Sequence, residues 1–330
     1  MNGLLNISFS EISFLKLDTA EHANFQGNQL FEDFPSFLVF KDDSRKKKKG
    51  EKIGGFLLLE IIGEGSKASV YKTIYKKEYW AVKKYQDEKD EPTEIILLRD
   101  NYDVFKKVPY CIHAKPYVIQ ANQKTNYLIK MPMLQSFIFG SSTTLTSSET
   151  ALFLYQIGTA LEYLHTHLIV HRDIKPQNVL IGDAGFVLCD FSVVEKLPSS
   201  SYTSTGVVGT SYYMAPEVSN TISYLPIPTD MWSLGVTVFH LIYGTLPFQL
   251  STLIGKDDSQ RTDYVNYATE LINCCELEFP EFPFVSVELK EIISGLLKKN
   301  PLERMTSEEL ISNQWITKTY QERNQFLSFL

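Results

Sequence analysis

The run His171-Arg172-Asp173-Ile174-Lys175-Pro176-Gln177-Asn178 constrains this chain more than any other part of its sequence. It places the carboxylate of Asp173 and the carboxamide of Asn178 on one short loop that follows a helical pattern. Asp173 can accept or orient the proton of an attacking hydroxyl, Lys175 can neutralise a transferring phosphoryl group, and Asn178 can hold a magnesium ion. The loop therefore predicts phosphoryl-transfer chemistry, and a purely structural role explains this combination poorly.

A second carboxylate, Asp190, lies twelve positions after Asn178, at the end of a strand-like run. Asp190 can bridge magnesium to the β- and γ-phosphates of a nucleotide. Because magnesium keeps several waters and uses few protein oxygens, one carboxylate and one carboxamide beside substrate phosphates are sufficient. The sequence therefore predicts Asn178 and Asp190 as the metal ligands.

The stretch from Ile62 to Val70 contains a predicted phosphate contact, because Gly63 and Gly65 let the backbone approach a polyphosphate. By itself, a plain hairpin turn explains such a short glycine motif better. Lys83 on the next strand changes that interpretation, since its ammonium can contact the α- and β-phosphates.

Glu94 opens the following predicted helix, and its carboxylate can hold Lys83 in place through an ion pair. The alternative is a first-turn glutamate that the helix dipole favours. We expect the paired role.

Apolar periodicity predicts short strands in the amino-terminal part of the chain and mostly helices after it. The predicted strands are Phe56 to Ile62, Ala68 to Tyr75, Glu78 to Lys84 and Tyr127 to Met131. A helix is predicted at Glu94 to Leu98, with Thr93 as its cap, and a long one after the capping box of Thr146 and Glu149. Further helical patterns cover Asp230 to Tyr243, Val265 to Cys275, Val287 to Leu297 and Ser307 to Trp315.

Composition narrows the class of protein. The 330 residues are 44% hydrophobic, which is enough for a large core, and a net charge of -7 argues against a general nucleic-acid binder. The basic run Arg45 to Lys49 is interpreted as a solvated linker, with an import signal or a lipid contact as alternatives. Four cysteines without metal or disulfide spacing, and the absence of a signal peptide or spanning segment, predict an intracellular protein, cytoplasmic or nuclear, without stable membrane insertion.

Taken in order, these motifs resemble the eukaryotic protein kinase family from Ile62 through Arg304. The resemblance rests on the glycine-bearing loop, Ala81-Val82-Lys83, Glu94, His171-Arg172-Asp173, Asp190-Phe191, Met214-Ala215-Pro216-Glu217 and the run from Asp230 to Gly235. It implies an α+β, bilobal protein kinase fold, with a small antiparallel β lobe carrying one main helix and a larger, mostly α-helical lobe. It also implies ATP and Mg²⁺ as cofactors and proteins as substrates.

The expected domain boundaries follow from where the motifs lie. We expect a kinase domain at 55–318, with a small lobe at about 55–133, a large lobe at about 134–318 and a tail at 319–330. Residues 1–54 carry none of the motifs and are interpreted as an extension that ends in a charged linker. The apolar stretch from Phe31 to Phe40 is expected to pack on the domain or on a partner.

The resemblance also implies a substrate class and a mode of control. Lys175-Pro176 and the run from Gly209 to Tyr213 are similar to the serine/threonine branch, and the segments Thr229 to Thr237 and Tyr243 to Phe248 are similar to calcium/calmodulin kinase kinases. Arg172 resembles the arginine of kinases that are switched on by a phosphate on the activation loop. The expected phosphosites are Thr205, then Ser204 and Thr203, modified by an upstream kinase or by autophosphorylation.

The adenine pocket is expected to follow the family as well. Ile62, Val70 and Ala81 would form its roof and Leu180 its floor. Counting along Tyr127-Leu128-Ile129 as the last strand of the small lobe puts Lys130 at the gatekeeper position. Met131 would then offer a carbonyl and Met133 an N–H to adenine.

Three departures from the family pattern concern control more than chemistry. Ala68 replaces the third glycine of the loop, Ser192 replaces the glycine expected after Asp190-Phe191, and the connection from Lys83 to Glu94 is short. None of them removes a catalytic group. They leave one alternative of another class, a kinase-shaped nucleotide-binding scaffold (a pseudokinase) that docks partners without transferring phosphate.

Overall fold

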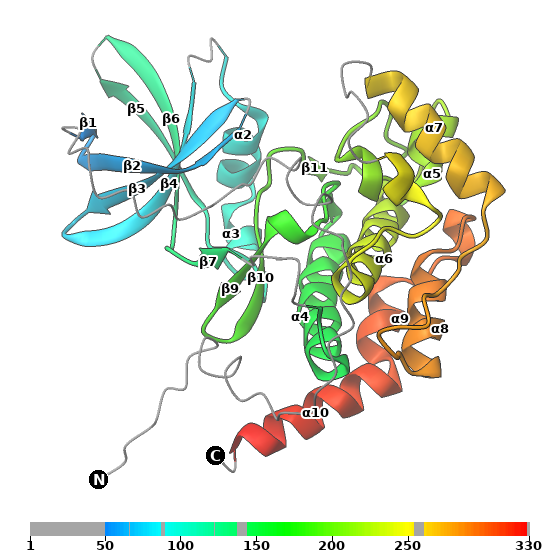
Figure 1. Cartoon of the computed structure of the whole chain (residues 1–330). Coiled ribbons are helices and arrows are strands. Elements are labelled where there is room, and N and C mark those ends of the chain that lie inside the picture. The colour runs from blue at the N-terminus through cyan, green and yellow to red at the C-terminus, as the bar shows by residue number, and fades with distance from the viewer. Residues whose placement is uncertain are drawn as a thin grey trace.

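Six antiparallel strands form the sheet of the amino-terminal lobe (Figure 1). The computed structural model describes residues 50–65, 67–86, 90–121, 123–136, 144–253 and 261–328. The sheet order is β1-β2-β3-β4-β6-β5, from β1 (Glu51–Ile53), β2 (Phe56–Glu64), β3 (Ala68–Tyr75), β4 (Glu78–Tyr85), β5 (Lys115–Ala121) and β6 (Lys124–Met131). The four predicted strands are present with bounds that differ by at most three residues, while β5 was not predicted. Strand β1 lies at the end of residues 1–54, where the sequence analysis expects a charged linker, but Glu51 pairs with Leu58 in the sheet.

Apolar side chains cover both faces of this sheet, but different parts of the chain supply them. On the inner face lies α2 (Thr93–Asp100), followed by α3 (Tyr102–Phe105), and Ile95 and Leu98 of α2 are fully buried. The outer face has its own small core around Phe56, whose ring stacks on Tyr75 with the centroids 4.4 Å apart. Such double coverage hides the period-two alternation that normally tells the faces of a strand apart.

The start of α2 differs from the sequence-based expectation. Pro92 is the residue that precedes the helix, and Thr93 is its first residue, so Thr93 is not the cap. Pro92 has an extended backbone and offers no side-chain hydrogen bond to the first turn. The prediction was wrong by one position because proline and threonine both favour helix starts.

The carboxy-terminal lobe is mostly helical (Figure 1). Its helices are α4 (Ser147–Thr166), α5 (Pro216–Asn220), α6 (Pro226–Tyr243), α7 (Arg261–Cys274), α8 (Val287–Leu296), α9 (Ser307–Ser312) and α10 (Gln314–Ser328). The predicted capping box opens α4: the N–H of Glu149 donates to Thr146 Oγ1, and Glu149 Oε2 accepts from the Thr146 N–H at 2.9 Å. The predicted single helix from Ser307 to Trp315 is two helices, because Asn313 interrupts it and caps α10 through the N–H groups of Trp315 and Ile316.

Short strands flank the run from His171 to Asn178 and the predicted metal ligand Asp190. A three-stranded sheet has the order β10-β9-β7, from β7 (Gln135–Ser136), β9 (Val179–Gly182) and β10 (Gly185–Leu188). A two-stranded sheet joins β8 (Ile169–Val170) to β11 (Glu195–Lys196). Because β8 ends at Val170, the run from His171 starts from a fixed strand.

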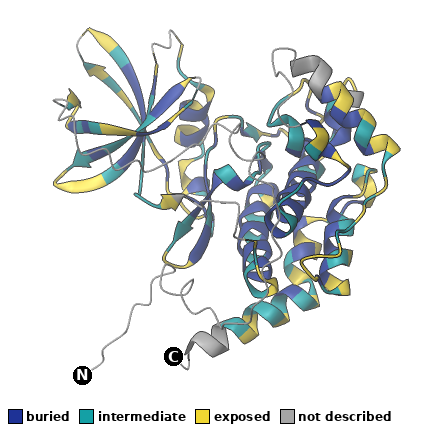
Figure 2. Ribbon diagram, in the orientation of Figure 1, coloured by how far each residue is buried: buried dark blue, intermediate teal, exposed yellow. Residues whose placement is uncertain are grey.

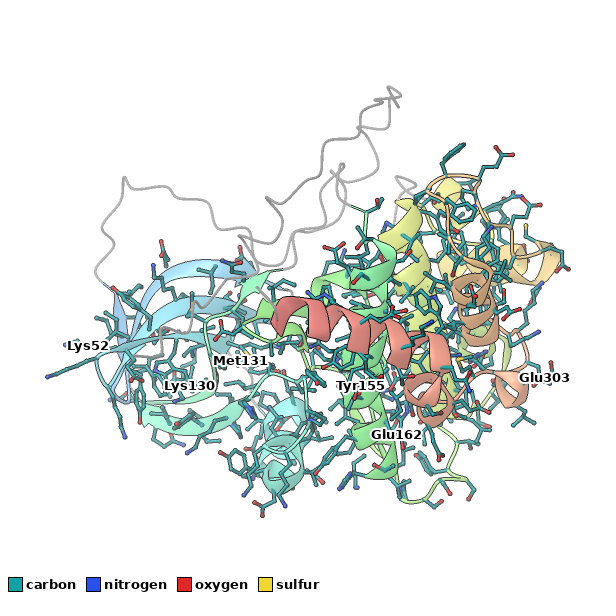
Figure 3. All side chains as sticks on the ribbon, turned by 90° about the horizontal axis from the view of Figure 1, so that it is seen from below. Lys52, Lys130, Met131, Tyr155, Glu162 and Glu303 are labelled. Atoms are coloured by element: carbon teal, nitrogen blue, oxygen red, sulfur yellow. The ribbon has the colours of Figure 1, made fainter. Side chains whose placement is uncertain are left out.

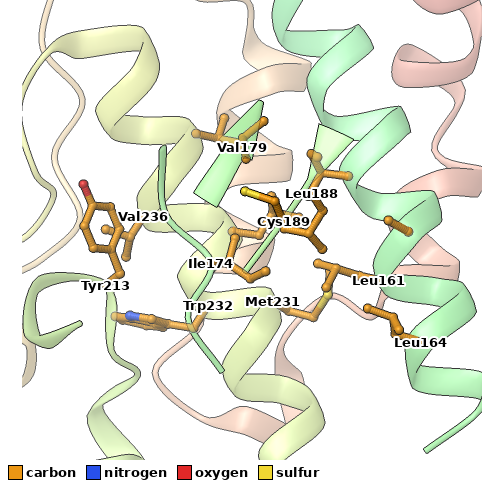
Figure 4. Close-up of a cluster of buried hydrophobic side chains, with 14 of the residues drawn as sticks. Leu161, Leu164, Ile174, Val179, Leu188, Cys189, Tyr213, Met231, Trp232 and Val236 are labelled. Carbon is orange, nitrogen blue, oxygen red and sulfur yellow. The ribbon is translucent and has the colours of Figure 1, made fainter. Parts of the chain in front are cut away.

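Most of the core lies in the large lobe, around α4 and α6 (Figure 2). Figure 4 shows part of this core, in which Ile174 of the run from His171 lies with Leu161 and Leu164 of α4 and Met231 and Trp232 of α6. All five side chains are at most 1% exposed. A rigid, densely packed base of this kind holds the loop above it in one conformation.

Helix α10 crosses α4 near Tyr155 (Figure 3). The ring of Tyr155 stacks on Tyr320, with centroids 4.1 Å apart. The expected tail at 319–330 is therefore helical as far as Ser328, and its first residues pack on the domain. No helix among the described residues is both long and apolar enough to span a membrane.

Candidate active site

A cleft with an empty volume of about 730 Å³, which includes space open to solvent, lies between the two lobes. Its lining includes eight residues that the sequence predicts as nucleotide contacts: Ile62, Val70, Ala81, Lys83, Glu94, Met131, Met133 and Leu180. Asn178 and Asp190, the predicted metal ligands, line the same cleft. Gly63 and Gly65 lie at the end of β2, where the N–H of Gly65 donates to the Ala68 carbonyl at 2.9 Å and closes the turn.

Lys83 joins the two lobes inside this cleft. Its Nζ lies 2.8 Å from Glu94 Oε2 and 2.7 Å from Asp190 Oδ1. Glu94 is only 4% exposed, and its Oε2 also accepts a hydrogen bond from the Tyr85 hydroxyl. Burial opposes the charge on Lys83, but the carboxylates of Glu94 and Asp190 outweigh it and raise the pKa of the ammonium. The structure thus brings together the three side chains that the sequence assigns to nucleotide and metal binding.

Asp190 keeps its charge for the same reason. Burial alone would raise the pKa of its carboxyl group, but the adjacent Lys83 ammonium holds that pKa at about 2. Its backbone has φ +67°, in the left-handed region that residues other than glycine rarely adopt. The following Phe191 is 1% exposed, and its ring packs edge-on against Phe105 and His171. This packing fixes the direction of Asp190 toward the cleft.

The run from His171 is held by Asp230 of α6, which is completely buried. Asp230 Oδ2 accepts the N–H of His171 at 2.8 Å, and Oδ1 accepts the N–H of Arg172 at 2.7 Å. Burial raises the pKa of Asp230, but the hydrogen bond from His165 and the N–H of His171 lower it overall. Arg172 itself has φ +65°, so Asp230 pins the loop in a strained turn.

Around Asp173 the side chains form a closed set of contacts. Lys175 Nζ lies 2.8 Å from Asp173 Oδ2 and donates to Thr210 Oγ1 at 2.7 Å, while the Thr210 hydroxyl donates to Asp173 Oδ1 at 2.7 Å. Asn178 Nδ2 donates to the carbonyl and to Oδ2 of Asp173, at 2.7 and 2.9 Å. Gly209, next to Thr210, permits this approach, since a Cβ there would lie 2.5 Å from the Arg172 carbonyl oxygen.

The donor atoms that remain suit magnesium. The amide nitrogen of Asn178 is used by Asp173, which leaves the amide oxygen of Asn178 for a cation. Lys83 and the N–H of Ser192 contact Asp190 Oδ1, which leaves Oδ2. One carboxamide and one carboxylate oxygen on the same cleft fit a hard cation that also binds phosphate oxygens.

Comparison with known proteins agrees with this geometry. A family model described as "Protein kinase domain" matches residues 56–316. The chain belongs to the protein kinase family. It is 29% identical over 299 residues to a probable serine/threonine-protein kinase of Dictyostelium discoideum, and the matched region covers 88% of this chain and 56% of that protein. It is 32% identical over 279 residues to serine/threonine-protein kinase 33 of Mus musculus, covering 78% and 54%.

A third relative is the calcium/calmodulin-dependent protein kinase kinase of Caenorhabditis elegans, 36% identical over 162 residues, or 48% of this chain and 28% of that protein. The chain spans about half the length of the first two relatives. The kinase family and the bilobal α+β fold are therefore confirmed.

The gatekeeper prediction was wrong by one residue. In the register of β4 and β6, Met131 faces Ala81 and Lys130 faces Val82, so Met131 shares the cleft side of the sheet with Ala81. Lys130 lies on the outer side, with its Nζ 3.5 Å from the ring centroid of Trp80. The error arose because the prediction counted residues along one strand, whereas the pairing of β6 with β4 decides which of its side chains face the cleft.

The expected phosphosites differ in exposure. Thr203 and Thr205 are exposed, whereas Ser204 is 1% exposed. Ser204 Oγ donates to Glu195 Oε2 at 2.7 Å. The same oxygen of Glu195 lies 2.5 Å from Nη1 of Arg172, so in this kinase Arg172 already has an anionic partner.

Sequence reasoning missed four residues of this kinase site. Tyr85, Thr210, Asp230 and Glu195 all hold a predicted functional residue through a hydrogen bond or ion pair. Thr210 and Asp230 lay inside motifs that supported the family resemblance, and that position was the available signal for them. Tyr85 and Glu195 gave no signal, because neither lies in a recognised motif and a single glutamate is usually exposed to solvent.

Proposed function

We propose that this kinase transfers the γ-phosphate of ATP to serine or threonine hydroxyls of protein substrates. The observation that carries the proposal is Lys83, whose ammonium lies within 2.8 Å of both Glu94 and Asp190 across the cleft. This arrangement aligns the small-lobe helix with the metal carboxylate. It supports an assembled catalytic site, even though the connection from Lys83 to Glu94 is short.

In this proposal Asp173 orients the acceptor hydroxyl and takes its proton. Lys175, 2.8 Å from Asp173, lies where its charge neutralises the transferring phosphoryl group. Asn178 and Asp190 would hold Mg²⁺, which, when bound, neutralises charge on the β- and γ-phosphates. Most of the rate enhancement would come from positioning and charge, since phosphoryl transfer needs little covalent help from the protein.

The nucleotide would lie between Ile62, Val70 and Ala81 on one side and Leu180 on the other, all of which line the cleft. Because Met131 takes the gatekeeper position, the proposed adenine contacts move by one residue to the Pro132 carbonyl and the Leu134 N–H. Both of these residues line the cleft. The side chains of Met131 and Met133 contribute apolar surface.

The acceptor class rests on two observations. Lys175 and Thr210 contact each other and Asp173, in the segments that are similar to the serine/threonine branch. Relatives in Dictyostelium and mouse are named serine/threonine-protein kinases. The similarity to a calcium/calmodulin-dependent protein kinase kinase supports a further proposal, that the substrates include other kinases.

Control by an activation-loop phosphate is a separate part of the proposal. Thr203 and Thr205 are accessible to an upstream kinase or to autophosphorylation. What such a phosphate would do depends on the partner that Arg172 already has in Glu195.

One experiment separates catalysis from a nucleotide-binding scaffold. The melting temperature of the purified chain is measured with ATP, with and without Mg²⁺, and transfer of labelled γ-phosphate to a generic protein substrate is then followed. A Mg²⁺-dependent shift together with transfer supports the kinase. A shift without transfer, under every condition tried, supports the scaffold.

A further inference from the structure

We infer that Glu195 is a positioning residue that takes the place of an activation-loop phosphate at Arg172, so that the kinase site assembles without phosphorylation. The inference rests on the proposed kinase activity and concerns its regulation. Its starting point is Arg172, which the sequence predicts to be the receptor for a loop phosphate.

The Arg172 guanidinium is held at two points by one segment. Nη1 lies 2.5 Å from Glu195 Oε2, and Nε donates to the Val193 carbonyl at 2.7 Å. The side chains of Arg172 and Glu195 are 16% and 23% exposed, so water screens their attraction only in part. A carboxylate in this place supplies the negative charge and the acceptor oxygen that a phosphate would supply.

Backbone pairing between β8 and β11 brings Arg172 and Glu195 close together. Glu195 lies on β11 and pairs with Val170 of β8, two residues before Arg172. The N–H of Leu197 extends the ladder to the Leu168 carbonyl at 2.7 Å. Both partners therefore start from adjacent strands, which lowers the conformational entropy lost when the ion pair forms.

Glu195, itself in the activation segment (residues 190–217), also binds a later part of that segment. Ser204 Oγ donates to Glu195 Oε2 at 2.7 Å, and the backbone of Ser204 pairs with Tyr224 through N···O distances of 2.9 and 3.0 Å. Glu195 thus links the catalytic loop at Arg172 to the segment at Ser204. A phosphate on the activation loop would order that segment against Arg172 in the same way.

This link coexists with an assembled site. In the same structure Lys83 contacts Glu94 and Asp190, and Thr210 contacts Asp173. The Arg172–Glu195 pair therefore belongs to the arrangement suited to catalysis and not to a locked one. A phosphate on Thr205 would approach a guanidinium that is already neutralised, with the Glu195 carboxylate repelling it.

The test uses the full chain after treatment with a broad-specificity protein phosphatase, with removal of phosphate verified by intact mass. Dephosphorylated wild type, and the variant Thr203→Val/Thr205→Val, are expected to keep their kcat for a protein substrate.

Glu195→Gln is expected to lose about tenfold in kcat, as for a lost charge-assisted hydrogen bond, with the KM for ATP unchanged. Ser204→Glu added to Glu195→Gln returns a carboxylate near Arg172 and is expected to restore kcat. The matched control is Glu322→Gln, which removes one partner of the exposed Lys318–Glu322 pair.

Several outcomes overturn the inference. A wild type that loses its activity on dephosphorylation and regains it on rephosphorylation refutes it, while the proposed kinase function stands. An unchanged or higher kcat in folded Glu195→Gln also refutes it, the latter by making Glu195 a brake. If Glu195→Gln does not fold, the phosphatase arm decides alone, because it needs only wild type. A wild type that transfers no phosphate in either state overturns the proposed function and this inference together.

Discussion

Thr210 donates a hydrogen bond of 2.7 Å from its hydroxyl to Asp173 Oδ1. Thr210 lies 37 positions after Asp173, at the far end of the activation segment. The contact therefore reports whether that segment is folded against the catalytic loop. It also leaves one carboxylate oxygen of Asp173 directed by Thr210 and the other by Lys175 and Asn178.

Thr210→Val should lower kcat by about tenfold or more, because Asp173 and Lys175 lose the hydroxyl between them and their contacts loosen. The KM for ATP should change little, since Thr210 is not among the residues that line the nucleotide cleft. Thr210→Ser keeps the hydroxyl and is the matched control. Equal steady-state rates for the valine and serine variants would show that the contact has no catalytic role.

Glu94→Gln should impair transfer more than Tyr85→Phe. Glutamine leaves Lys83 with Asp190 as its only anionic neighbour among these contacts, whereas phenylalanine removes one hydrogen bond and keeps the ion pair. We expect Glu94→Gln to lower kcat/KM for ATP by about tenfold or more, as for a hydrogen bond between charged groups. Steady-state kinetics on both variants test this, and a larger loss for Tyr85→Phe would reverse the ranking.

Local signals in the sequence predicted much of this molecule. The capping box of Thr146 and Glu149 located the start of α4, and the spacing of Asn178 and Asp190 predicted that these two groups would face one cleft. Lys83 and Glu94 could be paired in advance because an ion pair needs only two opposite charges on neighbouring elements. In each case the residues concerned lie at most twelve positions apart along the chain.

The failures have long-range causes. Lys130 was misplaced because the β4–β6 register and the Trp80 ring, 50 positions away, decide its side of the sheet. Glu195 could not be assigned to Arg172 because β11 meets β8 only in the folded chain. The predictions for residues 1–49, including the basic run from Arg45 and the apolar stretch from Phe31, concern a part of the chain outside the described residues.

Replacing Lys83 should reverse the direction in which the ionisation of Asp190 changes the stability of the fold with pH. In wild type the pKa of Asp190 is lowered from 3.8 to about 2, so its carboxylate stabilises the fold above the usual pKa, and this contribution is lost as pH falls toward 2. In Lys83→Met, burial without the ammonium raises that pKa, so stability is lost as pH rises through it.

The melting temperatures of wild type and Lys83→Met should therefore diverge as pH increases from about 3 to about 7. Lys84→Met is the matched control, because Lys84 on the same strand pairs with the half-exposed Glu51. A difference between wild type and Lys83→Met that stays constant across this range would contradict the electrostatic coupling.

Arg304 and Glu217 should form the ion pair that matters most for the stability of the large lobe. Arg304 donates from two nitrogens to the two carboxylate oxygens, at 2.6 and 3.0 Å, and its side chain is completely buried. Arg304→Met leaves the Glu217 carboxylate uncompensated and should lower the free energy of unfolding by about 3 kcal/mol. Urea denaturation measures this, with Glu322→Gln as an exposed control. A loss similar to that of the control would contradict the role of burial.

The most direct test of catalysis compares wild type with Asp173→Asn in transfer of labelled γ-phosphate from ATP to peptides that carry one serine, threonine or tyrosine. The carboxamide keeps the shape of Asp173 but cannot take a proton, so kcat should fall by at least about 100-fold. The Mg²⁺-ATP shift in melting temperature should remain, because Asp173 is not among the residues lining the nucleotide cleft. We predict that wild type labels serine and threonine but not tyrosine, and that Asp173→Asn labels none at a comparable rate. Equal rates for the two proteins, or a wild type that binds Mg²⁺-ATP and labels nothing, would contradict the proposed function.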